Sequence, residues 1–228
     1  MTPYGPLTHS RFHVPYQQRR LEGTRVFARR TRGAISATVL DLIDGLDDEA
    51  WVYWCIDDRY PIRLVQPAVE RVTEAVLADR LPAVDGLLFC RWGNMWRPEH
   101  LLGQDPQEGP DGVRLLPRRD YSQIWLHQFL RVKVLRYLFR RFRKRSPRQT
   151  FWIPLKHQVS LPADHRLYVV ETNLAVFGES TSRGRVTRNW RRKPSRHGHR
   201  ATAGIHRDRP RHHHGVIERD DPSSPRPP

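Results

Sequence analysis

The stretch Trp51-Val-Tyr-Trp-Cys-Ile-Asp57-Asp58 consists of six apolar or aromatic residues followed by two adjacent carboxylates. A short, continuous apolar run bounded by polar residues is typical of a strand buried on both faces, as in a mainly parallel sheet. The acidic pair would then lie at the carboxyl edge of that sheet, where open α/β folds bind ligands. Adjacent carboxylates repel each other unless a cation compensates, which favours a hard divalent metal at Asp57 and Asp58. The alternative is that Asp57 caps a turn and Asp58 faces solvent.

The segments around this stretch alternate between helical and strand-like patterns. Residues 35–46 have apolar residues near helical spacing and predict a helix that leads into the strand. Residues 67–81 predict a second helix, with Pro67 at its start and Pro82 just beyond its end. Residues 84–92 predict a second buried strand. A strand, a helix and a strand in succession indicate a βαβ unit, so we expect an α/β fold with a mainly parallel sheet and flanking helices.

Two further elements are predicted in the second half of the chain. Apolar residues recur at steps of three to five through residues 121–145, which predicts the longest helix, with a strongly basic second half. Residues 166–171 predict another strand, which ends in the carboxylate of Glu171.

Charge divides the chain unevenly. The formal net charge is +16, yet residues 35–110 hold six basic and fourteen acidic side chains. The basic excess therefore belongs to the flanking segments and says little about the fold. No apolar run is long enough to span a bilayer, and the first twenty residues lack the apolar core of a secretory signal. Cys55 and Cys90 lie inside apolar runs, so we expect buried thiols in a cytoplasmic protein.

These patterns suggest three parts. Residues 1–34 scatter Pro, Gly and Arg without periodicity and predict an irregular N-terminal segment. Residues 35–189 predict the α/β domain. Residues 190–228 are rich in Arg, His and Pro and contain no apolar run longer than two residues, so we expect a disordered tail. The tail also looks like the product of a reading frame that was not shaped by folding.

The order of motifs between residues 36 and 189 resembles that of A-type, nucleotide-diphosphosugar glycosyltransferases of bacterial polysaccharide assembly. The motifs are Asp57-Asp58 after Trp51, Ile124-Trp125, Glu171, and Gly178-Glu-Ser-Thr-Ser-Arg183-Gly184. The resemblance implies that the acidic pair holds Mn²⁺ or Mg²⁺ on the donor diphosphate. It also implies that Trp125 contacts the acceptor and that Arg183 lies near the diphosphate. The opening strand and loop for the nucleotide base are missing, so either they lie upstream of Met1 or the fold diverges.

Elementary chemistry agrees with this kind of site. Sugar transfer expels a nucleotide diphosphate, whose growing charge a cation or basic side chains must stabilise. Arg59, next to the acidic pair, and Arg183 could contact phosphate oxygens directly. An acceptor hydroxyl needs a base, and Glu171 is a candidate. The alternative for Glu171 is a solvated carboxylate at a strand end.

Alternatives remain for the other features. An aromatic such as Trp125, at helical spacing with Phe129, is usually part of the core, which is the alternative to acceptor contact. The basic run 140–145 could be a solvated helix end, or it could contact anionic lipid at the inner membrane, where lipid-linked acceptors are used. The competing function is a non-catalytic nucleic-acid-binding protein, suggested by the basic flanks. The chain has no zinc-finger, RNP or helix-turn-helix signature, which favours the enzyme.

Overall fold

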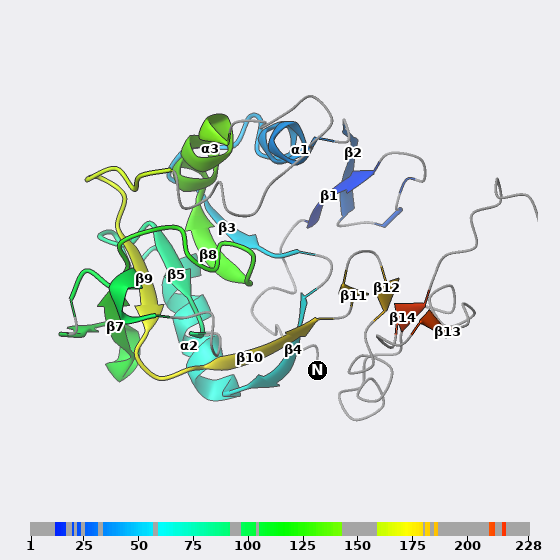
Figure 1. Cartoon of the computed structure of the whole chain (residues 1–228). Coiled ribbons are helices and arrows are strands. Elements are labelled where there is room, and N and C mark those ends of the chain that lie inside the picture. The colour runs from blue at the N-terminus through cyan, green and yellow to red at the C-terminus, as the bar shows by residue number, and fades with distance from the viewer. Residues whose placement is uncertain are drawn as a thin grey trace, which may run out of the picture.

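A computed structural model of the chain describes three α-helices and a central six-stranded sheet (Figure 1). The structure describes residues 12–16, 20, 22–23, 26–31, 34–56, 59–91, 97–103, 105–142, 159–179, 181–182, 185–186, 210–212 and 216–217. The helices are α1 (Ile35–Leu42), α2 (Gln66–Leu77) and α3 (Val132–Arg141). The helices at 35–46 and 67–81 are therefore confirmed, with somewhat shorter bounds.

The central sheet is mainly antiparallel, so the prediction of a mainly parallel sheet is wrong. Its strands are β3 (Trp51–Trp54), β5 (Gly86–Leu88), β6 (Gln107–Glu108), β7 (Arg114–Pro117), β8 (Gln128–Arg131) and β9 (Leu167–Val170). Their order in the sheet is β3-β8-β5-β9-β7-β6. Of the five pairings in this sheet, β5 with β9 is the parallel one.

The error arose at residues 128–131, which the sequence pattern assigned to a helix spanning 121–145. All four residues of β8 are buried, since the strand has a neighbour on each side and helices above and below it. Such a strand has no alternation of polar and apolar residues, so its apolar residues fit a helical period equally well. Gln123 has a φ of +61°, which a right-handed helix does not allow, and α3 begins only at Val132.

The insertion of β8 also explains why the βαβ pattern misled. Both β3 and β5 pair antiparallel with β8, so they run in the same direction, as a crossover through α2 predicts. They are not neighbours, however, because β8 lies between them. In the described part of the chain β3 is an edge strand, and its four residues are half-buried rather than buried on both faces.

Apolar residues on the two faces of the sheet form two cores. On one face α2 packs its valines against Leu87 and Phe129. On the other face α1 and α3 pack together and cover Leu130 and Leu167 (Figure 1). Gly86 lies between the last two residues, and a Cβ there would meet their methyl groups at 2.6 Å. A larger side chain at position 86 would therefore force the second core apart.

Four two-stranded sheets accompany the central one. β4 (Arg59–Leu64) pairs antiparallel with β10 (Ala175–Glu179), and β1 (Phe12–Tyr16) pairs parallel with β2 (Val26–Arg30). The other two pairs join β11 (Thr181–Ser182) with β12 (Arg185–Val186) and β13 (Pro210–His212) with β14 (Val216–Ile217). The segment 1–34, predicted to be irregular, thus contains two strands.

Several sequence predictions concern segments that the structure describes only in part. Of the predicted tail, 190–228, the structure describes β13 and β14. Of the basic run 140–145, it describes Arg140 and Arg141 at the end of α3, whereas residues 143–145 lie outside the described part. None of the helices in the described part of the chain has the length and apolar character that crossing a bilayer requires.

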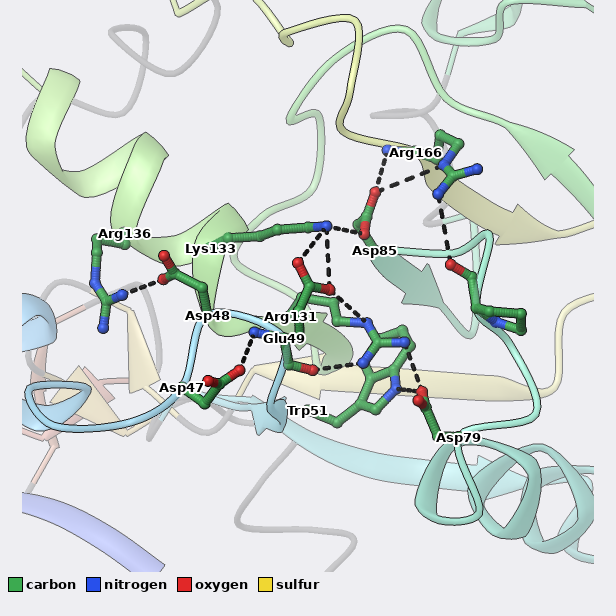
Figure 2. Close-up of polar contacts among 11 residues, drawn as sticks. Asp47, Asp48, Glu49, Trp51, Asp79, Asp85, Arg131, Lys133, Arg136 and Arg166 are labelled. Atoms are coloured by element: carbon green, nitrogen blue, oxygen red, sulfur yellow. Dashed lines mark hydrogen bonds and ion pairs between the residues drawn. The ribbon is translucent and has the colours of Figure 1, made fainter.

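A network of charged groups holds the strands together at the edge where β5 and β9 begin (Figure 2). The carboxylate of Asp85 is 2% exposed and lies 2.8 Å from the Lys133 ammonium. Its other oxygen accepts a hydrogen bond from the Arg166 backbone N–H at 2.8 Å. The Asp85 backbone adds bonds to β9 and β8, since its N–H donates to the Arg166 carbonyl and its carbonyl accepts from the Arg131 N–H.

Arg131 extends the network to the loops that precede β3 and β5. Its guanidinium lies 2.6 Å from the Asp79 carboxylate and 4.4 Å from the centre of the Trp51 ring (Figure 2). Glu49 bridges the two cations, with an oxygen 2.9 Å from the Lys133 ammonium and another 3.8 Å from Arg131. This arrangement fixes the amino-terminal ends of β3, β5 and β9 relative to the start of α3.

We predict that Asp85→Asn lowers the free energy of unfolding by about 3 kcal/mol, because the buried carboxylate that accepts from Lys133 and from the Arg166 N–H becomes an amide with a single acceptor oxygen. Urea denaturation at pH 7 measures this change. Asp48→Asn is the matched control: Asp48 is 55% exposed and pairs with Arg136, so its loss should cost less than about 1 kcal/mol. Equal effects of the two substitutions would contradict a central role for Asp85.

Candidate functional site

The candidate site lies at the edge of the central sheet where β3, β5 and β9 end. These three strands share one direction, since β3 and β5 oppose β8 and β9 runs parallel to β5. Their register aligns Trp54, Leu88 and Val169 in one row through Gln128 of β8. We call this the carboxyl edge. The described residues that follow each strand, at 55–56, 89–91 and 171–174, therefore lie along one side of the molecule.

The ribbon formed by β4 and β10 brings two distant sequence motifs together at this edge. Its register pairs Arg59 with Glu179 and Tyr60 with Gly178. Arg59 directly follows the acidic pair in the sequence. Gly178 opens the Gly178–Gly184 motif and lies 119 positions after Arg59. Pro61 sits at an irregularity in this pairing, next to Phe177, where its missing N–H is tolerated. The motifs could not be placed side by side from the sequence.

His127 occupies the centre of this region and was not singled out by the sequence. Its ring lies against Phe177 of β10, with 4.8 Å between ring centres, and edge-on to Tyr53 of β3 at 5.8 Å. Its Nδ1 is 3.4 Å from the Tyr53 hydroxyl, and its Nε2 is 3.4 Å from the carbonyl oxygen of Ile56. The imidazole thus joins β3, β10 and the segment that leads to the acidic pair.

Burial dominates the chemistry of His127. The side chain is 6% exposed, and burial lowers the pKa of its imidazole to about 4, with the nearby Arg59 guanidinium acting in the same direction. Hydrogen bonds to the Ile56 and Arg59 backbones oppose the shift without reversing it. His127 is therefore neutral at pH 7, so it orients its neighbours and does not add positive charge to the site.

The loop that carries His127 is held in place by two buried polar side chains. The Gln128 amide donates to the carbonyls of Gln123, Ile124 and Leu126 at 3.1–3.3 Å. The Gln128 side-chain oxygen accepts a 3.0 Å bond from Arg118, which also donates to the Ser122 carbonyl. These bonds satisfy the carbonyls of a loop that crosses a sheet face and has no regular structure of its own.

Asp57 and Asp58, the predicted metal ligands, lie outside the described residues, and so does Arg183. The residues on either side of the acidic pair are described, and the Arg59 N–H donates to the Ile56 carbonyl at 3.3 Å. Within the part of the chain that the structure describes, no cluster of three or more His, Cys, Asp or Glu side chains could hold a metal. A metal site at the acidic pair thus stays a prediction.

The structure places Glu171 at the same edge, directly after β9. Its carboxylate lies 3.1 Å from Nε of Arg114, and its backbone carbonyl accepts from Arg91. Three strand spacings separate β9 from β3, which is about 14 Å. Because Asp57 and Asp58 lie outside the described residues, a role of Glu171 as the base stays a prediction.

Trp125 packs into the core of the face that α1 and α3 cover. Its ring centre lies 6.3 Å from that of Trp54 and 6.2 Å from that of Phe139. This packing favours the alternative of a core aromatic over an acceptor platform. The two cysteines also differ: Cys90 is buried as predicted, whereas Cys55 is exposed, because β3 ends at Trp54 and the chain leaves the sheet.

We predict that the free energy of unfolding falls by up to about 3 kcal/mol as the pH drops from about 6.5 to 4, owing to His127 alone. The unfolded chain binds a proton on this residue in that interval, and the folded chain does not. Denaturation at several pH values, compared with His127→Gln, isolates this contribution.

An NMR titration provides the direct check, because the His127 ring signals should not move above about pH 5. In the control variant Tyr53→Phe the pKa of His127 should stay low, since burial and not the hydroxyl is its main cause. A His127 titration near pH 6.5 would contradict the buried, neutral ring.

No family model, curated protein or solved structure matches this chain. The function therefore has to be inferred from the chain's own residues and their arrangement.

Proposed function

We propose that this chain transfers a sugar from a nucleotide-diphosphosugar donor to a polysaccharide or lipid-linked acceptor, with Mn²⁺ or Mg²⁺ bound at Asp57 and Asp58. The observation that carries the proposal is the pairing of Arg59 with Glu179 in the β4–β10 ribbon. It joins the start of the Gly178–Gly184 motif to the residue that follows the acidic pair. The resemblance to A-type glycosyltransferases implies a donor site made from these two motifs.

The chemistry of the two motifs suits a diphosphate. Carboxylate oxygens are the ligands that hard divalent cations prefer, and a bound cation would neutralise the leaving diphosphate. Arg59 and Arg183 supply guanidinium groups that can contact phosphate oxygens in pairs. The acidic pair follows β3 in the sequence by three positions, and β3 ends at the carboxyl edge, which supports this use even though the sheet is mainly antiparallel.

His127 would support the donor site through its position. A neutral imidazole beside the Ile56 carbonyl and the Arg59 backbone holds both sides of the acidic pair without competing with the cation. Glu171 is the candidate base for the acceptor hydroxyl in this scheme. Its carboxylate lies at the carboxyl edge, 3.1 Å from Nε of Arg114.

We expect Cys55 to report on occupancy of this site. Cys55 is exposed two positions before Asp57, whereas Cys90 is buried and burial raises the pKa of its thiol to about 12. Iodoacetamide should thus modify Cys55 alone in the folded chain. A nucleoside diphosphate with Mn²⁺ should slow that reaction, which mass spectrometry measures.

Calorimetric titration gives the affinity of the same complex. Asp57→Asn and Asp58→Asn should each weaken nucleoside diphosphate binding about tenfold or more, which is about 1.4 kcal/mol. Asp47→Asn and Asp48→Asn are controls of equal charge in a second Asp-Asp pair, which is exposed, and they should leave both affinity and Cys55 protection unchanged. Equal behaviour of the two pairs would contradict the donor site.

Transfer itself is tested by incubating the chain with a panel of nucleotide-diphosphosugars and Mn²⁺. Slow, metal-dependent release of the nucleoside diphosphate is expected from the correct donor, because water replaces a missing acceptor. Asp57→Asn should abolish the release. A chain that binds no nucleoside diphosphate in the presence of Mn²⁺ would refute the proposal.

A further inference from the structure

A basic pocket lies at the opposite edge of the central sheet from the candidate donor site. It has a volume of about 220 Å³ and is formed where β7 ends, where β9 begins and by residues 161–165. Its charged lining consists of Arg118, Arg119, His165 and Arg166, and none of the described residues that line it carries a carboxylate. The pocket is reachable from solvent, since Leu102 and the Arg166 side chain on its rim are 60% and 50% exposed.

The charge of Arg118 is not balanced by a close carboxylate. The residue is 1% exposed, and among the described residues no Asp or Glu oxygen lies within ion-pairing distance of its guanidinium. Burial lowers the pKa of Arg118 to about 10, while the charge of the nearby Asp120 opposes the shift, and the group stays charged at pH 7. A buried cation without a direct ion pair is costly, so an anion bound close to it would stabilise the fold.

Buried polar atoms without partners gather around the same place. Arg118 Nε, the Tyr121 hydroxyl and His165 Nδ1 are buried and have no hydrogen-bond partner among the described residues. Arg118 and His165 line the pocket, and Tyr121 is close enough to Arg118 for the two groups to interact electrostatically. A buried N–H donor and a hydroxyl left unpaired each cost free energy, and an oxygen-rich ligand could satisfy them.

The remaining cations of the pocket have weaker ties. Nε of Arg119 donates to the Leu101 carbonyl at 3.4 Å, a neutral acceptor that leaves its charge unbalanced. Nε of Arg166 lies 3.9 Å from Asp85, but that carboxylate is already 2.8 Å from Lys133. The pocket therefore carries a net positive charge.

We propose that this pocket binds a phosphate group, separately from the donor site proposed above. A phosphate group has enough oxygens to accept from Arg118, Arg119 and Arg166 together, and guanidinium groups bind such oxygens in pairs. The sheet separates the pocket from the carboxyl edge, so a ligand here is not part of a diphosphate bound at Asp57 and Asp58. Arg118 connects the pocket to the loop that carries His127, through Ser122 and Gln128.

Inorganic phosphate titrated into the full chain in the presence of EDTA tests the proposal by calorimetry. The chelator removes any cation from the acidic pair, so that site cannot hold the anion. Saturable binding is expected, and Arg119→Gln and Arg166→Gln should each weaken it about fivefold or more. Arg71→Gln is the matched control, since Arg71 is exposed on α2, which contributes no residue to the pocket lining.

The ionisation of His165 supplies a second readout that does not depend on the arginine variants. Burial lowers the pKa of His165. The charges of Asp164 and Asp85 raise this pKa, and those of Lys133 and Arg141 lower it. The ring of His165 packs edge-on against Tyr137. Phosphate should raise this pKa by about half a unit or more in an NMR titration, because a nearby anion favours the protonated ring.

Glycerol 3-phosphate, titrated in the same way, distinguishes the source of the group. Tighter binding than inorganic phosphate would indicate a phosphate monoester as the ligand, and weaker binding would indicate the free ion. Absence of saturable binding, an unchanged His165 titration, or an equal loss in Arg71→Gln would overturn the proposal. The nucleoside diphosphate complex requires Mn²⁺ and Asp57, so either proposal can fail without the other.

Discussion

The buried carboxylate of Asp85 holds the central sheet together. A single residue connects three strands and a helix: its side chain contacts Lys133 at the start of α3, and its backbone bonds to β8 and β9. Removing a carboxylate from water is costly, and the cost is offset here because both oxygens have charged or N–H partners. This interaction fixes how far β5 can slide relative to its neighbours, and thereby aligns the far ends of β3, β5 and β9.

That alignment places the two chemically distinctive regions at opposite edges. The amino-terminal ends of β5 and β9 carry the charged network and the basic pocket, whereas their carboxyl ends face the β4–β10 ribbon, His127 and the segment of the acidic pair. The loop between β7 and β8 spans the distance from one edge to the other. Arg118 lines the pocket and bonds to Gln128, which in turn bonds to the loop that carries His127. A ligand at Arg118 would therefore contact a residue that positions this loop.

The described residues around the acidic pair combine rigidity with polarity. His127 is packed between aromatic rings and stays neutral, so its two nitrogens can order backbone groups without adding charge. Arg59 and the start of the Gly178–Gly184 motif are tied by strand pairing. A site built in this way holds its backbone in place before a ligand arrives, which lowers the entropy that binding must overcome.

The sequence by itself determined those helices and strands whose pattern of apolar residues fits only one type of secondary structure. The helices at 35–42 and 66–77 follow from apolar spacing and from Pro67, and the strands at 51–54, 86–88 and 167–170 follow from short apolar runs. The tertiary structure alone decided that residues 128–131 form a strand between β3 and β5, because a fully buried strand and a buried helix share the same composition. This insertion accounts for two of the four antiparallel pairings, and the pairings of β7 with β9 and with β6 account for the other two. The role of His127 also depended on the fold, since its partners come from β3 and β10, far away in the sequence. Arg118 bonds to Ser122 and Gln128, which are close in sequence, but only the fold buries it.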